Sequence, residues 1–152
     1  MGKIDDALAR TAGQRVYFDT NAFVYFLDRH PEYFGLVAPF IEAAANGSLL
    51  GVTGDAAVAE TLVKPYQLDN LPLVASIKAF FHAKDFLSIL PHDSETFDLA
   101  AQFRARLSMK FIDALHYATA VRAGCKFFLT NDAGIRSTPA LEVLSIREMA
   151  GR

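Results

Sequence analysis

The sequence predicts an α/β fold of three layers, in which a central parallel sheet of four to five strands lies between helices on both faces. Short apolar segments of strand length alternate along the 152-residue chain with longer segments of helical periodicity. The strand segments lack a polar face, which is typical of parallel strands buried between two helical layers. The expected strands are 16–18, 49–53, 86–90, 126–129 and 141–144.

Helical segments precede the first strand and separate most of the later ones, and glycine, asparagine or proline marks several of their ends. The expected helices are 3–13, 22–29, 32–45, 56–63, 72–81, 94–107 and 112–123. We expect residues 1–14 to form an N-terminal helical extension of a domain that spans residues 15–152. Thr20 and Asn21 are able to cap the helix after the first strand, and the fourth helix is expected to stop before Pro65.

Composition and charge limit the cellular compartments and the kinds of partner that we expect for this protein. The single cysteine, Cys125, excludes an internal disulfide and a zinc site built from cysteines, and it fits a reducing compartment. The N-terminal residues lack the apolar segment of a signal peptide, and no run reaches the roughly 18 apolar residues of a membrane span. We therefore expect a cytoplasmic protein without membrane contact. The net charge of −2 gives no overall attraction for a polyanion, so a nucleic acid would need a local basic patch or metal ions.

Four acidic residues occupy positions where a carboxylate is unusual. Asp19 and Asp132 each follow an apolar strand, Glu60 is the only charge in a helix without a polar face, and Asp113 opens a strongly apolar helix. Each acid alone has an ordinary explanation as a helix cap, a turn residue, an exposed helix residue or a first-turn acid. Because the carboxyl ends of parallel strands converge on one sheet edge, we expect all four side chains to meet in one pocket.

Carboxylates that share a pocket raise each other's pKa unless a cation compensates their charge. Ligation by oxygen alone, without cysteine or a convincing histidine, selects Mg²⁺ or Mn²⁺ over zinc. Such an ion activates water and neutralises charge on a phosphoryl group, which makes phosphodiester hydrolysis the leading chemistry.

Four segments together resemble the motifs of the PIN-domain nucleases. Asp-Thr-Asn begins at Asp19, Glu60 lies on the helix after the second strand, Asp-Ala-Leu-His-Tyr-Ala-Thr-Ala begins at Asp113, and Leu-Thr-Asn-Asp ends at Asp132. The similarity extends over about residues 15–145, and the length is similar to that of the VapC-type toxins of toxin–antitoxin pairs. The helix before the first strand is longer than the segment that these toxins usually have there.

The resemblance implies a Mg²⁺ or Mn²⁺ site, single-stranded or structured RNA as substrate, and an antitoxin protein as partner. It makes Asp19, Asp113 and Asp132 the metal ligands, while Glu60 is a ligand, a ligand through water or the general base. The residues expected around this site are Thr20, Asn21, Thr130 and Asn131. One or two ions would orient a water for in-line attack and leave a 3′-hydroxyl and a 5′-phosphate.

Histidines and basic residues give weaker signals. His82 and His92 are expected at the surface or as caps, because neither has a partner at ligand spacing on its own element. His116 lies one turn beyond Asp113 and could reach the pocket, although packing within the helix is the more common role. The basic residues that we consider for RNA contact are Lys64, Arg104, Arg106, Lys110 and Arg122.

Two alternatives to a nuclease stay open. A Mg²⁺-dependent phosphatase or phosphoryl-transfer domain also places aspartate at strand ends, but the haloacid-dehalogenase type needs an aspartate where Asn21 stands. The other alternative is a PIN-like module for binding and assembly without nuclease activity. Several phenylalanines could cover a homodimer interface or an antitoxin peptide, although core packing is the more common use. These are Phe23, Phe26, Phe34, Phe40, Phe80 and Phe81.

Overall fold

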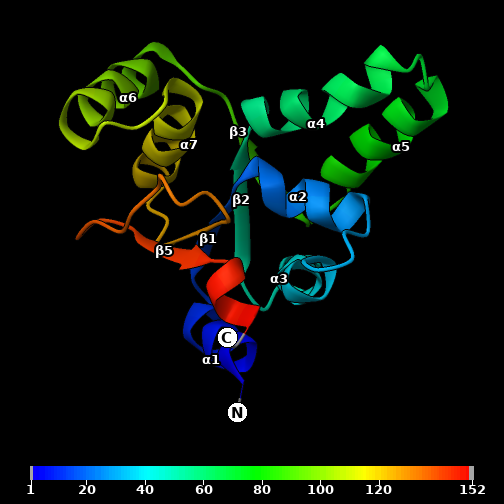
Figure 1. The fold of residues 1–152 in the computed structure, drawn as a ribbon, viewed down its shortest axis with the longest axis horizontal. Helices are drawn as coiled ribbons and strands as arrows, with labels where there is room; N and C mark the ends of the chain where they lie inside the picture. Colours follow the sequence, from blue (N-terminus) through cyan, green and yellow to red (C-terminus); the bar gives the residue numbers. More distant parts are fainter. Residues whose placement is uncertain (1, 151–152) are drawn as a thin grey trace.

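The computed structural model describes residues 2–150 and contains a five-stranded sheet of order β3-β2-β1-β4-β5. Every neighbouring pair of strands is parallel, which confirms the predicted fold class (Figure 1). The strands are β1 (Arg15–Phe18), β2 (Leu50–Gly54), β3 (Leu87–Leu90), β4 (Phe127–Thr130) and β5 (Glu142–Ser145). The helices are α1 (Lys3–Thr11), α2 (Thr20–Leu27), α3 (Phe34–Ala45), α4 (Asp55–Gln67), α5 (Leu71–Phe81), α6 (Ser94–Leu107), α7 (Phe111–Arg122) and the 3-10 helix η1 (Arg147–Ala150).

Alternate side chains of the central strand face two separate cores. Val16 and Phe18 are fully buried in the core that α2, α3, α4 and α5 complete, whereas Tyr17 is fully buried in the core that α6 and α7 complete. Figure 1 shows these two groups of helices on opposite sides of the sheet. The apolar residues of β1 therefore serve both faces, as the sequence indicated.

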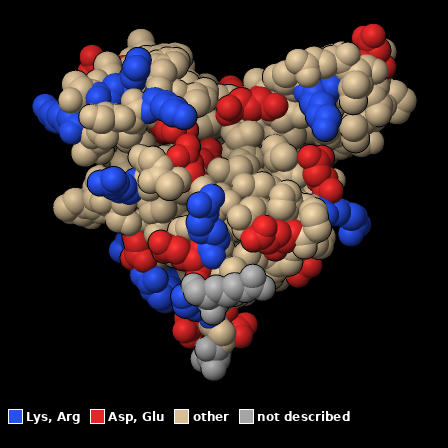
Figure 2. Space-filling model, in the orientation of Figure 1, with Lys and Arg blue, Asp and Glu red and all other residues tan. Residues whose placement is uncertain are grey.

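Two helical pairs extend beyond the carboxyl edge of the sheet. The pair α4 and α5 lies on one side and the pair α6 and α7 on the other, with the ends of β1 and β2 between them (Figure 1). The space-filling view shows a notch between the two lobes, with acidic side chains in it (Figure 2). The carboxyl ends of β1 and β2, after which Asp19 and the Glu60 helix follow, thus lie between the two lobes.

Two helix boundaries differ from the prediction. α4 does not stop before Pro65 but continues to Gln67, with Thr61, Leu62 and Pro65 all buried. Burial of this face outweighs the single hydrogen bond that a proline removes from the helix. At α2 the cap is Asp19 and not Thr20 or Asn21, because the Asp19 side chain accepts the first free N–H of the helix.

The first helix packs against the end of the chain. α1 contacts α3 and η1, and Arg10 forms an ion pair with Glu142 of β5 at 2.5 Å. Lys3 adds a hydrogen bond to the Glu148 carbonyl at 3.3 Å. The division into residues 1–14 and 15–152 stays a prediction. Within residues 2–150 no helix has the length and apolar character that a membrane crossing requires.

The phenylalanines belong mainly to the core. Phe23, Phe40 and Phe81 are at most 1% exposed, so they offer no surface to a partner. Phe26 and Phe80 are partly buried and stack on each other with ring centroids 5.6 Å apart. Core packing is therefore their main role, as expected.

Candidate active site

Asp19 is buried beside the end of β4 with only 5% of its surface exposed. One carboxylate oxygen accepts the Thr20 backbone N–H at 2.8 Å, and the other accepts the Thr130 hydroxyl at 2.7 Å. Burial raises the pKa of Asp19 above its ordinary value, although His116 and the Thr130 hydrogen bond act in the opposite direction. Asp19 therefore caps α2 from inside the molecule, where a carboxylate is costly unless something compensates its charge.

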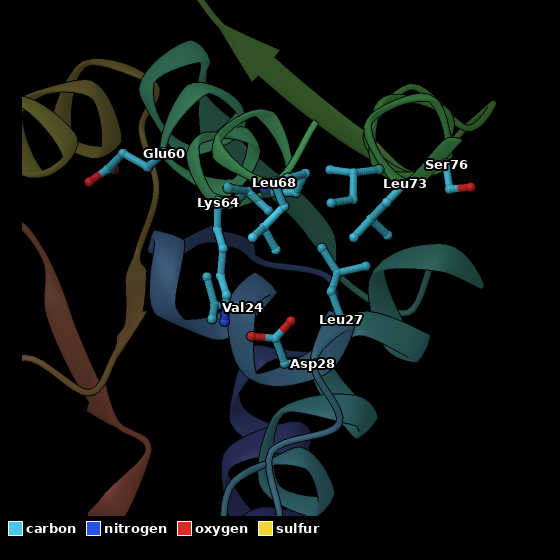
Figure 3. Close-up of a pocket in the computed structure, with 11 residues that line it drawn as sticks. Val24, Leu27, Asp28, Glu60, Lys64, Leu68, Leu73 and Ser76 are labelled. Carbon is cyan, nitrogen blue, oxygen red and sulfur yellow. The ribbon is translucent and has the colours of Figure 1, made fainter. Parts of the chain in front are cut away.

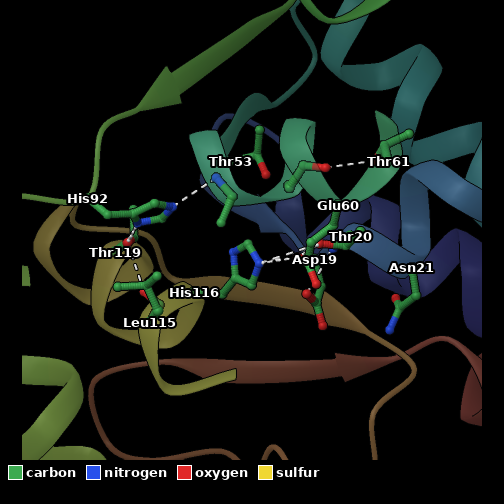
Figure 4. A network of polar contacts seen from close by, with 12 residues as sticks. Asp19, Thr20, Asn21, Thr53, Glu60, Thr61, His92, Leu115, His116 and Thr119 are labelled. Carbon is green, nitrogen blue, oxygen red and sulfur yellow. Dashed lines mark hydrogen bonds and ion pairs between the residues drawn. The ribbon is translucent and has the colours of Figure 1, made fainter. Parts of the chain in front are cut away.

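Glu60 belongs to a chain of hydrogen bonds that runs into the core (Figure 4). The Thr20 hydroxyl donates to Glu60 Oε1 at 2.5 Å, and His116 Nε2 lies 3.0 Å from the same oxygen. His116 Nδ1 lies 2.6 Å from the Tyr17 hydroxyl. Because an ionised carboxylate only accepts, His116 Nε2 donates to Glu60. Burial acts to raise the pKa of Glu60, but the bonds from His116 and Thr20 outweigh it and hold that pKa below its ordinary value.

Asp113 and Asp132 form the third part of the site. Asp113 lies in the first turn of α7, and Asp132 follows β4 with one oxygen accepting the Gly134 backbone N–H at 2.8 Å. Burial, and then the carboxylates of Asp132 and Asp19, raise the pKa of Asp113 to about 7. The raised pKa favours the protonated form of Asp113, which can donate a hydrogen bond to Asp132.

The predicted neighbours of the acids hold the ends of β1 and β4 together. Asn21 Nδ2 donates to the Thr130 hydroxyl at 3.4 Å, and Asn21 Oδ1 accepts the Asn131 backbone N–H at 3.3 Å. Asn131 in turn donates to the Tyr25 hydroxyl at 3.1 Å and accepts the Arg147 backbone N–H at 3.0 Å. These side chains fix the two loops that carry Asp19 and Asp132.

The acids converge in the cleft without forming a finished metal cage. In the part of the chain that the structure describes, no three carboxylate, imidazole or thiol groups lie close enough to hold an ion in their present orientations. The donor set nevertheless fits a hard cation, because every group is a carboxylate and their mutual repulsion is uncompensated. Asp19, Asp113 and Asp132 would hold such an ion, with Glu60 beside them.

Sequence reasoning missed how the histidines connect the elements. His92 Nδ1 lies 2.8 Å from the Thr119 hydroxyl of α7, and its Nε2 accepts the Ala56 backbone N–H at 3.1 Å. His92 is thus a capping residue, as predicted, but it caps α4 and not the helix that follows it in sequence. Gly54 makes room, since a Cβ there would lie 2.4 Å from the His92 ring. A glycine directly before the α4 helix was the only sequence signal for this close approach.

The basic residues divide into paired and free groups. Arg122 forms ion pairs with Asp93 and Glu95 at 2.5 and 2.8 Å, which leaves its charge already compensated. Arg104 donates to the Met109 carbonyl at 3.4 Å. Arg106 makes no side-chain hydrogen bond or ion pair with residues 2–150. In Figure 2 Lys and Arg side chains lie on the lobe that carries α6 and α7.

An apolar cavity of about 390 Å³ lies on the other side of Glu60, between α2, α4 and α5 (Figure 3). Aliphatic side chains such as Val24, Leu27 and Leu73 form most of its wall, and Lys64 and Asp28 stand at its rim. A wall of this kind suits an apolar side chain better than a phosphate group. Among the basic residues considered for RNA contact, Lys64 is therefore the one that lies beside the apolar cavity.

A model of the PIN domain matches residues 16–141 of this chain. The chain belongs to the PIN domain family. PIN domains are generally nucleases that use divalent metal ions, so family membership agrees with the chemistry of the acids in the cleft. The resemblance read from the four motifs is confirmed.

Several solved structures share the fold of this PIN domain. A toxin–antitoxin complex from Klebsiella pneumoniae matches with a TM-score of 0.65 and 15% identity, covering 86% of this chain and 97% of that chain. VapBC2 from Rickettsia felis, bound to a promoter DNA fragment, matches with a TM-score of 0.66 and 17% identity over 86% of this chain and 98% of that one. VapC20 from Mycobacterium tuberculosis, a toxin that cleaves the Sarcin-Ricin loop, matches with a TM-score of 0.60 and 13% identity over 74% of this chain and 86% of that one. At these identities the likeness shows the fold, and comparison with curated proteins gives no match.

Proposed function

We propose that this PIN domain is a metal-dependent endoribonuclease and acts as the toxin of a toxin–antitoxin pair. The observation that carries the proposal is the convergence of Asp19, Asp113 and Asp132 at the carboxyl edge of the sheet, with Glu60 held next to them. Family membership supports nuclease chemistry, and the fold is shared with VapC20, which cleaves RNA of the Sarcin-Ricin loop.

A divalent ion bound by Asp19, Asp113 and Asp132 would polarise a phosphate oxygen and lower the pKa of a bound water. The two ends of the site differ in protonation, because the pKa of Glu60 is lowered and that of Asp113 is raised. Glu60 stays ionised because His116 and Thr20 donate to it, and it can accept a proton from an attacking water. Thr130 keeps the Asp19 carboxylate oriented toward the cleft, which lowers the cost of arranging the site when the substrate arrives.

The apolar cavity beside Glu60 supports the antitoxin part of the proposal. An apolar side chain of a partner peptide seated there would lie next to Glu60. Shared fold with two toxin–antitoxin complexes points the same way. A homodimer stays a proposal whose test is the mass of the purified protein in solution.

The test is cleavage of RNA by purified protein with Mn²⁺, with excess chelator, and with the Asp19→Asn variant. We expect cleavage that needs the metal, is lost in the variant and leaves a 5′-phosphate on the downstream fragment. Metal binding without cleavage of any cellular RNA would favour the assembly module instead. Hydrolysis of p-nitrophenyl phosphate in place of RNA would favour the phosphatase.

A further inference from the structure

A second cavity, of about 560 Å³, opens between the end of α6 and the loop after β4. One wall is the link between α6 and α7, with Arg106 and Ser108, and the other is the loop after β4, with Gly134 and Arg136. The first wall leads directly into α7, which carries Asp113, and Gly134 on the second wall donates its N–H to Asp132 at 2.8 Å. Both walls of the cavity are therefore joined to segments that carry one member of the acid pair.

Two arginines line the cavity, and their positive charges are not paired with an acid within residues 2–150. Arg106 and Arg136 both line it, and neither guanidinium forms a hydrogen bond or an ion pair with any side chain or backbone group of residues 2–150. No acidic residue is among those that line the cavity. The cavity is therefore locally positive in a chain whose net charge is −2.

Hydroxyl groups complete a donor-rich lining. The Ser137 hydroxyl oxygen accepts the Val143 backbone N–H at 2.8 Å, so its hydrogen is left to donate elsewhere. Ser108 ends α6 in a left-handed conformation, with φ of 54°, and its side chain also lines the cavity. Guanidinium forks and hydroxyl donors around one space match the oxygens of a phosphate group.

The loop that carries Arg136 is held in place before any ligand binds. The Tyr117 hydroxyl lies 3.2 Å from the Arg136 carbonyl and 2.8 Å from the Thr138 hydroxyl. Ile135 is only 4% exposed and anchors the middle of the loop in the core of α6 and α7. A wall fixed in this way binds at a lower entropic cost than a mobile loop.

We propose that the cavity between Arg106 and Arg136 binds a phosphodiester group of the RNA strand next to the one that is cleaved. This inference rests on the proposed nuclease function and adds the position of the strand. The sugar-phosphate backbone of the RNA then runs along the lobe of α6 and α7, and no phosphate occupies the apolar cavity beyond Glu60. Recognition through phosphate alone carries no base specificity.

The test is binding of a fluorescently labelled single-stranded RNA of random sequence, measured by anisotropy in excess chelator so that no cleavage occurs. We expect the double variant Arg106→Gln with Arg136→Gln to bind about ten-fold more weakly than the parent. The slope of log K against log salt between about 50 mM and about 200 mM should become shallower by about 0.7 for each phosphate that the variant no longer neutralises. In the cleavage assay KM should rise while kcat changes little.

A matched control removes two charges from the opposite edge of the sheet. Lys84 and Lys126 are exposed, precede β3 and β4, and form no side-chain bond within residues 2–150, so Lys84→Gln with Lys126→Gln changes net charge equally. We expect the control to keep the parent affinity and salt slope. A second variant, Arg106→Lys with Arg136→Lys, should keep the salt slope and lose part of the affinity, because lysine lacks the planar fork.

The outcomes separate this inference from the proposed function. Suppose that the parent cleaves RNA and that the double variant Arg106→Gln with Arg136→Gln binds RNA with the same affinity and salt slope as the parent. This result would overturn the phosphate site and leave the nuclease function in place. Binding that the double variant loses, in a protein that never cleaves RNA, would keep the phosphate site and overturn the nuclease. Absence of binding by the parent at low salt, or an equal loss of affinity in the Lys84→Gln with Lys126→Gln control, would overturn the site.

Discussion

Replacing Asp113 with asparagine should stabilise the metal-free protein at neutral and alkaline pH. Burial and the carboxylates of Asp132 and Asp19 raise the pKa of Asp113 from 3.8 to about 7. Protonated Asp113 is favoured in the folded state, so the stability that it contributes is fully present below pH 3.8 and is lost as the pH rises through about 7. Asparagine cannot ionise, and its amide can donate to Asp132 as the protonated acid does.

The size of the effect follows from the shift of about three pH units. At about 1.36 kcal/mol per unit this corresponds to about 4 kcal/mol for a fully buried group. Because Asp113 is only half-buried, solvent screening reduces the expected gain to about 2 kcal/mol. We therefore expect the free energy of unfolding of Asp113→Asn to exceed that of the parent by about 2 kcal/mol near pH 8, with the difference shrinking toward pH 5.

Urea denaturation in excess chelator between about pH 5 and about pH 8 measures this difference directly. The exposed Asp98, whose bond to Gln102 asparagine can keep, provides the control Asp98→Asn, for which we expect no pH-dependent gain. Saturating Mn²⁺, at about 100 times its Kd, should then stabilise the parent by about 2.7 kcal/mol and leave Asp113→Asn nearly unchanged, which reverses their order. A difference between parent and variant that does not vary with pH would refute the raised pKa of Asp113.

Two substitutions test parts of the site, and one labelling experiment tests the core behind it. Thr130→Val removes the hydroxyl that donates to Asp19 and should lower the free energy of unfolding by about 1.5–3 kcal/mol; unchanged stability would mean that water replaces this bond. Tyr17→Phe leaves His116 Nδ1 without its partner in the core and should cost about 1–3 kcal/mol by urea denaturation, whereas a cost below about 0.5 kcal/mol would contradict a stabilising role for this bond. Burial raises the pKa of Cys125 to about 12, so its thiol should react with Ellman's reagent at pH 8 only when the protein unfolds, and rapid labelling of the native protein would show that this part of the core opens.

The sequence was sufficient for the layers of the fold, because these follow from local patterns, and it predicted a common sheet edge for the acids. Apolar strands ending in Asp19 and Asp132 require a common sheet edge once the strands are parallel. The sequence was insufficient to predict where α4 ends. The cost of Pro65 within this helix depends on how much of that face is buried by α5 and α2. The balance between propensity and burial is a tertiary property that residue spacing does not contain.

The side-chain network of the site was also beyond local patterns. The bond from Tyr17 to His116 joins residues 99 positions apart, and the bond from Ala56 to His92 joins residues 36 positions apart. The cavity between Arg106 and Arg136 likewise depends on how one loop is placed against another. Strand order determines all three, and several orders are compatible with the same alternation of strands and helices.

The pairing of β1 with β4 determines when the acidic site can form during synthesis of the chain. Asp19 and its partner Thr130 are 111 positions apart, and at about 5–20 residues per second the ribosome adds the second roughly 6–22 s after the first. A nascent chain that has not yet released β4 lacks Asp132 and the strand that positions Asp19. The acidic site is therefore incomplete in a nascent chain until β4 has been added and has paired with β1.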